Sequence, residues 1–263
     1  MAFETVALIV VALLFAIVAF FYSNLGLGGG QLFVPIMILA FAIPMKEVVP
    51  ISLSCAFVTM LTSMYSHSRK GLVDFKLGAY LSLAGILGVI IGALFTLSVA
   101  DTVVKAGFAA LLVIVATKMM YDIYRSKKDY ESCPTEHSRK TMAAGLGTSL
   151  ITGILVGSFG IGGGVVSVPL IIYVFCFEPR KAIGTSAMMG AILTPAAFIA
   201  YALDEGLSIH YDLILLLVPI VFVFALIGSR WGLEKLKTKI VKTIFTFGVY
   251  LAAAGMLYSL LFA

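Results

Sequence analysis

The sequence Asn24-Leu-Gly-Leu-Gly-Gly-Gly-Gln-Leu-Phe-Val-Pro35 returns in altered form as Ser158-Phe-Gly-Ile-Gly-Gly-Gly-Val-Val-Ser-Val-Pro169, 134 positions later. The four glycines and the closing Val-Pro pair are the same in both copies, so six of the twelve positions agree. The offset is about half of the 263-residue chain. A repeat of that period predicts a duplicated fold with one copy of the motif in each half.

Each glycine cluster follows one apolar run and opens another. Because consecutive glycines weaken a helix, we expect the helix to break there and to expose backbone N–H groups. Inside a membrane such groups need surrounding protein or a wet cavity. The N-terminus of the next helix would offer free donors and a partial positive charge, which suit an anion. The alternative interpretation is that the glycines only let helices pack closely.

The composition places the chain among membrane proteins. It is 61% hydrophobic and 12% charged, with a mean hydropathy of +1.11. These values are typical of an all-α polytopic membrane protein and exclude an ordinary soluble domain. Ten apolar segments follow one another, five in each half: 6–22, 31–43, 48–66, 77–100, 102–124, 142–156, 165–176, 182–203, 213–229 and 240–263. The two segments after the glycines are short, more like half-helices than full spans.

The segments define the expected domain organisation. We interpret residues 1–263 as a single transmembrane domain, with repeat one at 1–124, a polar cytoplasmic linker at 125–140 and repeat two at 141–263. Five crossings per half is an odd number, so the two repeats would be inverted relative to each other. Inverted repeats with interrupted helices are typical of secondary transporters.

The basic residues distinguish two topologies. If all ten segments change sides, 16 of the 18 Lys and Arg residues share one side, and only Lys46 and Lys105 lie on the other. If each short segment returns to the side it came from, the division is 9 to 9. Basic residues collect on the cytoplasmic side of membrane proteins. The sequence therefore favours ten crossings of the plasma or inner membrane, with both termini outside.

The doubled Gly-x-Gly-Gly-Gly-x-x-x-Val-Pro motif, with Ala182-Ile-Gly184-Thr185-Ser186 after its second copy, resembles the TauE/SafE sulfite exporter family. The resemblance runs over the whole chain. It implies a transporter for sulfite, an organosulfonate such as sulfoacetate, a related sulfur oxyanion or a small carboxylate, with export the expected direction. The first half departs from the pattern, because Val48-Val-Pro50-Ile51-Ser52 stands in place of the Ala-x-Gly-Thr-Ser form. An equal contribution of the two halves is therefore not assumed.

The expected site combines backbone donors at 28–31 and 162–165 with side chains at matched positions of the two halves. Asn24 matches Ser158, and Ser52 matches Ser186, beside which Thr185 adds a hydroxyl. For each hydroxyl the alternative is a hydrogen bond to a carbonyl of its own helix. The candidate substrate-binding residues are Asn24, Gly28, Gly29, Gly30, Gln31, Ser52, Ser158, Gly162, Gly163, Gly164, Val165, Thr185 and Ser186.

Acidic residues are missing from the interior of all ten segments. Proton-coupled transporters often hold an intramembrane carboxylate, so the usual proton carrier is not expected here. Transport would be uncoupled, or coupled through protonation of the substrate, through His67, or through an ion held by carbonyls. A divalent-cation transporter is disfavoured for the same reason, because a hard cation prefers carboxylate oxygens. His67 stands beside Ser68-Arg69-Lys70 at the predicted cytoplasmic end of its segment. We interpret it as a lipid headgroup contact rather than a proton carrier.

The remaining expectations concern function class and partners. The intramembrane residues are too poor in catalytic groups for an enzyme, so we expect no catalytic residues, no metal and no cofactor. The expected partners are a small anionic substrate and membrane lipid, without nucleic acid, and a homo-oligomer is left open. A passive anion channel could use the same glycine breaks and is the main alternative to a transporter.

Overall fold

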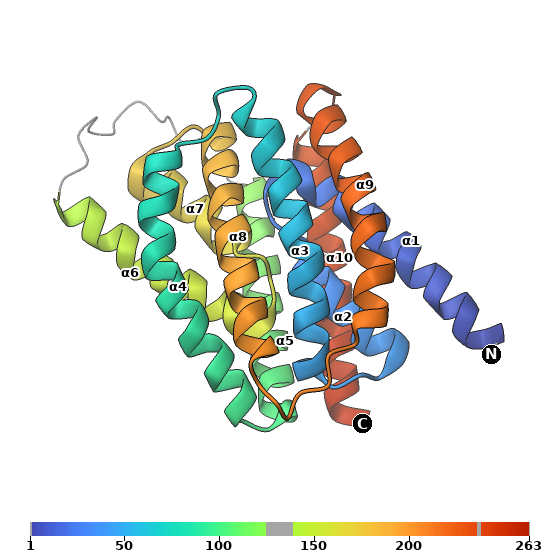
Figure 1. The fold of residues 1–263 in the computed structure, drawn as a ribbon. Coiled ribbons are helices and arrows are strands. Elements are labelled where there is room, and N and C mark those ends of the chain that lie inside the picture. Colours follow the sequence, from blue (N-terminus) through green and yellow to red (C-terminus); the bar gives the residue numbers. More distant parts are fainter. Residues whose placement is uncertain (1, 125–138, 236–237, 263) are drawn as a thin grey trace.

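The computed structural model describes residues 2–124, 139–235 and 238–262, and within these ranges it contains helices and no strand (Figure 1). The first half comprises α1 (Ala2–Leu25), α2 (Gly30–Phe41), α3 (Met45–Ser68), α4 (Phe75–Ser98) and α5 (Asp101–Tyr124). The second half comprises α6 (Arg139–Phe159), α7 (Gly164–Phe175), α8 (Pro179–Ala202), α9 (Tyr211–Lys235) and α10 (Thr238–Phe262). The predicted all-α class and the ten segments are confirmed. Of the predicted linker, only its last two residues lie in the described ranges, and they open α6.

Two of the helices are half the length of the others. The helices α2 and α7 have 12 residues each, which is about 18 Å of helix against a hydrocarbon core of about 30 Å. Each begins after a glycine with positive φ and ends at matched left-handed residues, Ala42 (φ 51°) and Cys176 (φ 56°). The prediction of a short, glycine-broken helix in each half is therefore confirmed.

Six described helical segments are long and apolar enough to cross a membrane. They are Thr5–Leu25, Met45–Ser68, Phe75–Ser98, Arg139–Phe159, Pro179–Ala202 and Tyr211–Trp231. The two short helices, α2 and α7, are not among these six and have the half-helix length that the sequence predicted. Since α2 starts near the middle of the molecule and runs to the end where α1 begins, α1 and α2 enter and leave at the same end (Figure 1). The helices α6 and α7 do the same from the opposite end.

The loops and helix ends lie at the same two ends of the molecule as in the ten-crossing topology. At one end the starts of α3, α5 and α9 meet, through Lys46 on Asp101 and His210 on Glu47. At the other end the last turn of α3 meets α9, and the starts of α4 and α8 meet. Among the described residues, Lys46 and Lys105 belong to the first end. The other end carries Arg69, Lys70, Lys76, Lys118, Arg139, Lys140, Arg180, Lys181 and Arg230.

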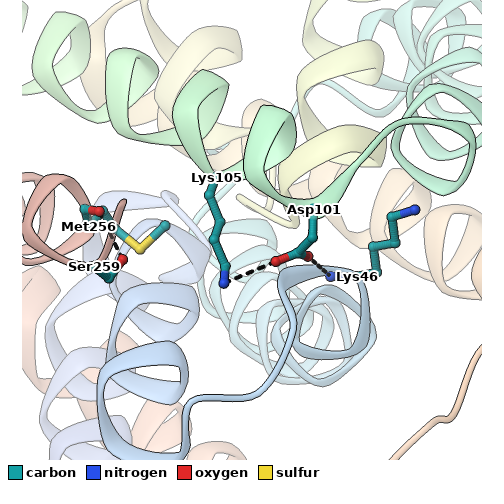
Figure 2. A network of polar contacts seen from close by, with 5 residues as sticks. All are labelled: Lys46, Asp101, Lys105, Met256 and Ser259. Atoms are coloured by element: carbon teal, nitrogen blue, oxygen red, sulfur yellow. Dashed lines mark hydrogen bonds and ion pairs between the residues drawn. The ribbon is translucent and has the colours of Figure 1, made fainter. Parts of the chain in front are cut away.

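At the sparsely charged end, one carboxylate holds two helix starts together (Figure 2). Asp101, the first residue of α5, accepts a hydrogen bond from the backbone N–H of Lys46 at 3.3 Å. It also pairs with the ammonium of Lys105 at 3.0 Å. The Lys46 ammonium donates to the Leu97 carbonyl at the end of α4, at 2.9 Å. Lys46 thus joins α3 to α4 and α5, and Lys105 holds the Asp101 carboxylate from within α5.

The two halves interlock instead of packing as separate bodies. The helix α1 lies along α9 of the second half, and α6 lies along α4 of the first half. Both contacts depend on glycine, because a Cβ at Gly228 would fall on the Phe20 carbonyl oxygen and one at Gly92 on the Ile154 carbonyl oxygen. Phe20 and Ile154 are themselves 134 positions apart. Contacts paired in this way are what an inverted repeat would produce, and the inversion itself stays a prediction.

Candidate substrate-binding site

The two glycine loops, residues 26–29 and 160–163, cross each other in the interior of the molecule. A Cβ added at Gly28 would lie 2.9 Å from the Cα of Gly162, and the reverse distance is the same. On either side of this contact, a Cβ at Gly30 would fall on the Gly160 carbonyl oxygen, and one at Gly164 on the Gly26 carbonyl oxygen. The glycines are therefore needed for backbone-to-backbone packing of the loops, as the alternative interpretation of the motif proposed.

The same loops also present free backbone donors. Gly29 (φ 88°) and Gly163 (φ 83°) lie in the left-handed region, which costs glycine little and other residues more. Neither helix start has a side-chain cap. The Gly29 carbonyl accepts from the N–H groups of Leu32 and Phe33 at 2.9 and 3.0 Å. For Gly30 and Gln31, just before them, no backbone N–H bond exists within the described residues.

The second loop repeats this pattern at α7. The Gly163 carbonyl accepts from the N–H groups of Val166 and Ser167 at 3.2 and 3.0 Å. The N–H groups of Gly164 and Val165 have no acceptor in the described part of the protein. Four N–H groups, two at each helix start, are thus directed out of the helices, where the positive ends of the helix dipoles add to their attraction for an anion.

Gln31 distinguishes the first break. Its side chain is 1% exposed, and neither its amide nitrogen nor its amide oxygen has a hydrogen-bond partner in the described structure. The Tyr22 hydroxyl lies beside this amide. A buried amide without partners costs about 1–3 kcal/mol. A buried amide of this kind at a helix N-terminus is a candidate for binding a ligand that accepts hydrogen bonds.

The matched residues Asn24 and Ser158 join helices near the two breaks. The Asn24 amide donates to the Gly228 carbonyl of α9 at 2.7 Å, and the Ser158 hydroxyl donates to the Gly92 carbonyl of α4 at 3.1 Å. Both side chains therefore attach the end of a long helix to its neighbour. The Asn24 amide oxygen is buried and has no partner among the described residues.

The hydroxyls of α3 and α8 divide between the loops and the helix ends. Ser52 donates to the carbonyl of Gly160 in the opposite loop at 2.9 Å. Ser186 shares a 2.6 Å hydrogen bond with Ser167, which donates to Gly163 at 3.0 Å. Thr185 lies away from the loops, where its hydroxyl accepts from the Asp74 N–H at the start of α4, at 3.0 Å.

The sequence interpretation of His67 as a headgroup contact is wrong. Its side chain is fully buried, because α8 packs against the end of α3 and the His67 Cβ lies against Gly184. Its Nδ1 lies 2.8 Å from the Ser63 carbonyl oxygen. Its Nε2 has no partner in the described structure.

Sequence reasoning also missed Ser167, the neighbour of Ser186. Its matched position in the first half is Phe33, so a search for matched polar pairs passes over it. The burial of His67 could not be found in the same way, because polar and basic neighbours in the sequence indicate an exposed helix end.

Comparison with known proteins identifies the family. The sequence profile described as sulfite exporter TauE/SafE matches residues 11–256, nearly the whole chain. The protein belongs to the TauE/SafE family. The predicted resemblance is therefore confirmed, and this family member is a multi-pass membrane transporter, not an enzyme.

Proteins of similar sequence agree with this class. The TauE/SafE chain is 24% identical to the probable membrane transporter protein YunE of Bacillus subtilis, over 92% of this chain and 94% of that protein. It is 27% identical to the B. subtilis probable membrane transporter protein YdhB, covering 74% and 78% of the two chains. The probable membrane transporter protein MJ0441 of Methanocaldococcus jannaschii is 24% identical over 83% and 82%. No solved structure gives a significant match.

Proposed function

We propose that this protein is a secondary transporter of a small sulfur oxyanion, such as sulfite or an organosulfonate, and that it exports this anion across the cell's inner membrane. The observation that carries the proposal is the pair of crossed loops, with four free N–H groups and the unpaired Gln31 amide beside them. The family description supports the same substrate class.

The donors fit an oxyanion because their number matches its acceptors. A sulfite or sulfonate group has three oxygens, each able to accept more than one hydrogen bond. Backbone N–H groups and a neutral amide supply these bonds without a fixed positive charge. A hydrogen bond to a charged group contributes about 1.5–3 kcal/mol, so two or three of them give useful affinity and still permit release. The same donors would also hold a small carboxylate, which is the alternative substrate class.

Binding is tested by a melting-temperature screen of the purified protein. A ligand that binds the folded state raises its melting temperature as ligand concentration rises. We expect a rise with at least one of sulfite, thiosulfate, sulfoacetate, taurine, sulfate or the small carboxylate acetate. Dimethyl sulfone, which has sulfonyl oxygens without charge, is the matched control and should give no rise. An equal response to the anions and to the control would contradict the proposal.

Transport is distinguished from a passive channel by flux measurements. With the protein in liposomes, a transporter gives slow flux that saturates with substrate concentration. A channel gives measurable conductance with weak saturation. Saturable flux of the anion found in the screen is the expected result, and conductance would favour the channel.

The orientation is proposed from charge. We propose that the end carrying most basic residues faces the cytoplasm, with both termini outside. In a variant without its three native cysteines, a single cysteine replaces Glu205, at the sparsely charged end, or Arg69, at the other end; both positions are exposed. An impermeant thiol reagent applied to intact cells should label residue 205 and leave residue 69 unlabelled. The opposite pattern would reverse the orientation.

A further inference from the structure

We propose that His67 takes up a proton together with the transported anion, so that the anion binds more tightly as the pH falls. This inference rests on the proposed function, because it requires an anion in the crossed loops. It adds a named proton-binding residue to a protein whose transmembrane segments contain no interior carboxylate.

The hydrogen bonds of His67 define its protonation. Nδ1 lies 2.8 Å from the Ser63 carbonyl oxygen, and a carbonyl can only accept, so Nδ1 carries the ring proton. In the neutral imidazole Nε2 is then a bare acceptor. It is buried and has no donor within the described residues. A buried acceptor in this state is satisfied when it receives a proton or a donor from a ligand.

The position of His67 connects it to the first break. Its Cβ lies against Gly184 of α8, and the carbonyl of the preceding residue, Ile183, lies against Gly26 of the first loop. On the other side, the neighbouring Ser66 shares a 2.7 Å hydrogen bond with Ser229. Ser229 follows Gly228, whose carbonyl accepts from Asn24 at the end of α1. His67 thus lies among the residues that surround the entry to the first glycine loop.

The charges around His67 make its protonation depend on the anion. The charged groups that act on the imidazole are Lys70, at the end of its own helix, and Arg180 of α8. Both are positive. An imidazolium formed here alone would be buried beside two cations, which is unfavourable. An anion in the neighbouring loop would remove this repulsion.

The other elements packed here do not offer a compensating negative charge to His67. On α9, Ser229 bonds Ser66, the neighbour of His67, and on α1, Asn24 bonds the adjacent Gly228; both side chains are neutral. The next residue of α9, Arg230, is exposed. At the start of α4, Asp74 accepts from the Leu77 N–H and lies 3.8 Å from the Lys181 ammonium.

The direction of the pH dependence of anion binding follows from thermodynamic linkage. A proton from the solution adds to Nε2, which becomes an N–H, and no other bond changes. If the proton binds better when the anion is present, the anion must bind better when the proton is present. One linked proton makes the anion affinity rise by up to about tenfold for each unit that the pH falls. The rise is confined to the range in which the occupied site is protonated and the empty site is not.

Binding of sulfoacetate and of methanesulfonate to the purified protein, measured by calorimetry between about pH 5.5 and 8, tests the inference. The charge of neither probe changes in this range. For the wild-type protein we expect at least a tenfold gain in affinity from the highest to the lowest pH. His67→Gln should bind with an affinity that is constant with pH. His210→Gln is the matched control, because His210 is partly exposed and bonds Glu47 at the other end of the molecule.

A second measurement keeps the test independent of how the variants fold. In weakly buffered solution near neutral pH, binding to the wild-type protein should take up a proton, up to about one per anion. His67→Asn accompanies His67→Gln, and melting temperatures of both verify folding. Binding without proton uptake, or unchanged pH dependence in a folded His67 variant, would overturn the role of His67 and leave the proposed function intact. If neither probe binds the wild-type protein at any pH, sulfonates are excluded as the transported anion, and the inference, which is tested on a bound sulfonate, fails with that part of the proposed function.

Discussion

The two glycine breaks have the same backbone and different side chains. Each has a left-handed glycine before a 12-residue helix and two free N–H groups in the first turn. At the second free position, the first break has the buried, unpaired Gln31, and the second break has the half-buried Val165. Under the proposed function, the backbone would attract the anion in both halves, whereas recognition by a side chain would belong to the first half.

The helices that cover the two short helices also differ between the halves. The first short helix is covered by α10, where Leu32 and Leu39 lie against Gly248 and Gly255. The second short helix packs mainly on α6 and α8. The first short helix is therefore the more covered of the two, whereas the glycines of both breaks are buried.

The largest expected effect tests what the breaks share. Gly30→Ala and Gly164→Ala each place a methyl group on a carbonyl oxygen of the opposite loop, so both should destabilise the protein by about 1–3 kcal/mol or more. Gly147→Ala is the control, because nothing lies within 4 Å of its added Cβ. Melting temperatures in detergent provide the measurement. Equal melting of Gly30→Ala and Gly147→Ala would show that the loops do not pack as described.

The next effect tests what separates the breaks. Gln31→Val makes the first break resemble the second, and should weaken anion binding about tenfold or more through the loss of hydrogen bonds to a charged ligand. The ligand-free protein should keep or gain stability, because an unpaired buried amide is removed. Calorimetry and melting temperatures on the same sample measure both. Val165→Gln is the reciprocal variant, and a similar loss of affinity there would assign recognition equally to both halves.

A smaller effect is expected where matched residues make matched bonds. Asn24→Ala and Ser158→Ala each remove a hydrogen bond to a glycine carbonyl of a neighbouring helix. Each should cost about 1 kcal/mol of stability. Urea or thermal unfolding can compare them with Thr148→Ala, whose hydroxyl bonds only within its own helix. If only one of the two variants loses stability, the hydrogen bonds of Asn24 and Ser158 are not equivalent.

The smallest effect distinguishes the hydroxyls. Ser52→Ala removes a bond between the two halves and should cost about 0.5–1 kcal/mol. Ser186→Ala should cost less, because Ser167 keeps its own bond to Gly163. The difference is measurable as a difference in melting temperature. A larger cost at Ser186 would instead indicate that its hydroxyl contributes beyond the bond to Ser167.

Much of the fold was predictable because it depends on strong local signals. Long apolar runs require helices in a membrane, and consecutive glycines interrupt them, so the ten helices, two of them short, followed from the sequence. The depth of the short helices did not. Charge reports the side on which a loop lies and carries no information about how far a hairpin reaches into the membrane, so the two short segments were predicted as half-helices without a depth.

The candidate site was predictable only in its backbone. The matched glycines located the breaks, because the same glycine spacing in two copies can be recognised without knowing which residues each loop contacts. The side chains did not follow from matching. Thr185 is next to Ser186 in the sequence, but successive residues of a helix point in different directions. The Thr185 hydroxyl therefore accepts a hydrogen bond at the start of α4, away from the loops. His67 required knowledge that α8 covers the end of α3.

The packing of α1 on α9 also has a consequence for how the protein is made. Asn24 and its acceptor Gly228 are 204 residues apart. At about 5–20 residues per second of synthesis, α1 waits about 10–40 seconds in the membrane before α9 emerges. The second loop, which packs against the first, is also still unmade for most of that time. During that time the nascent chain holds the first glycine loop without the second loop and without α9, the two parts that it packs against in the finished protein.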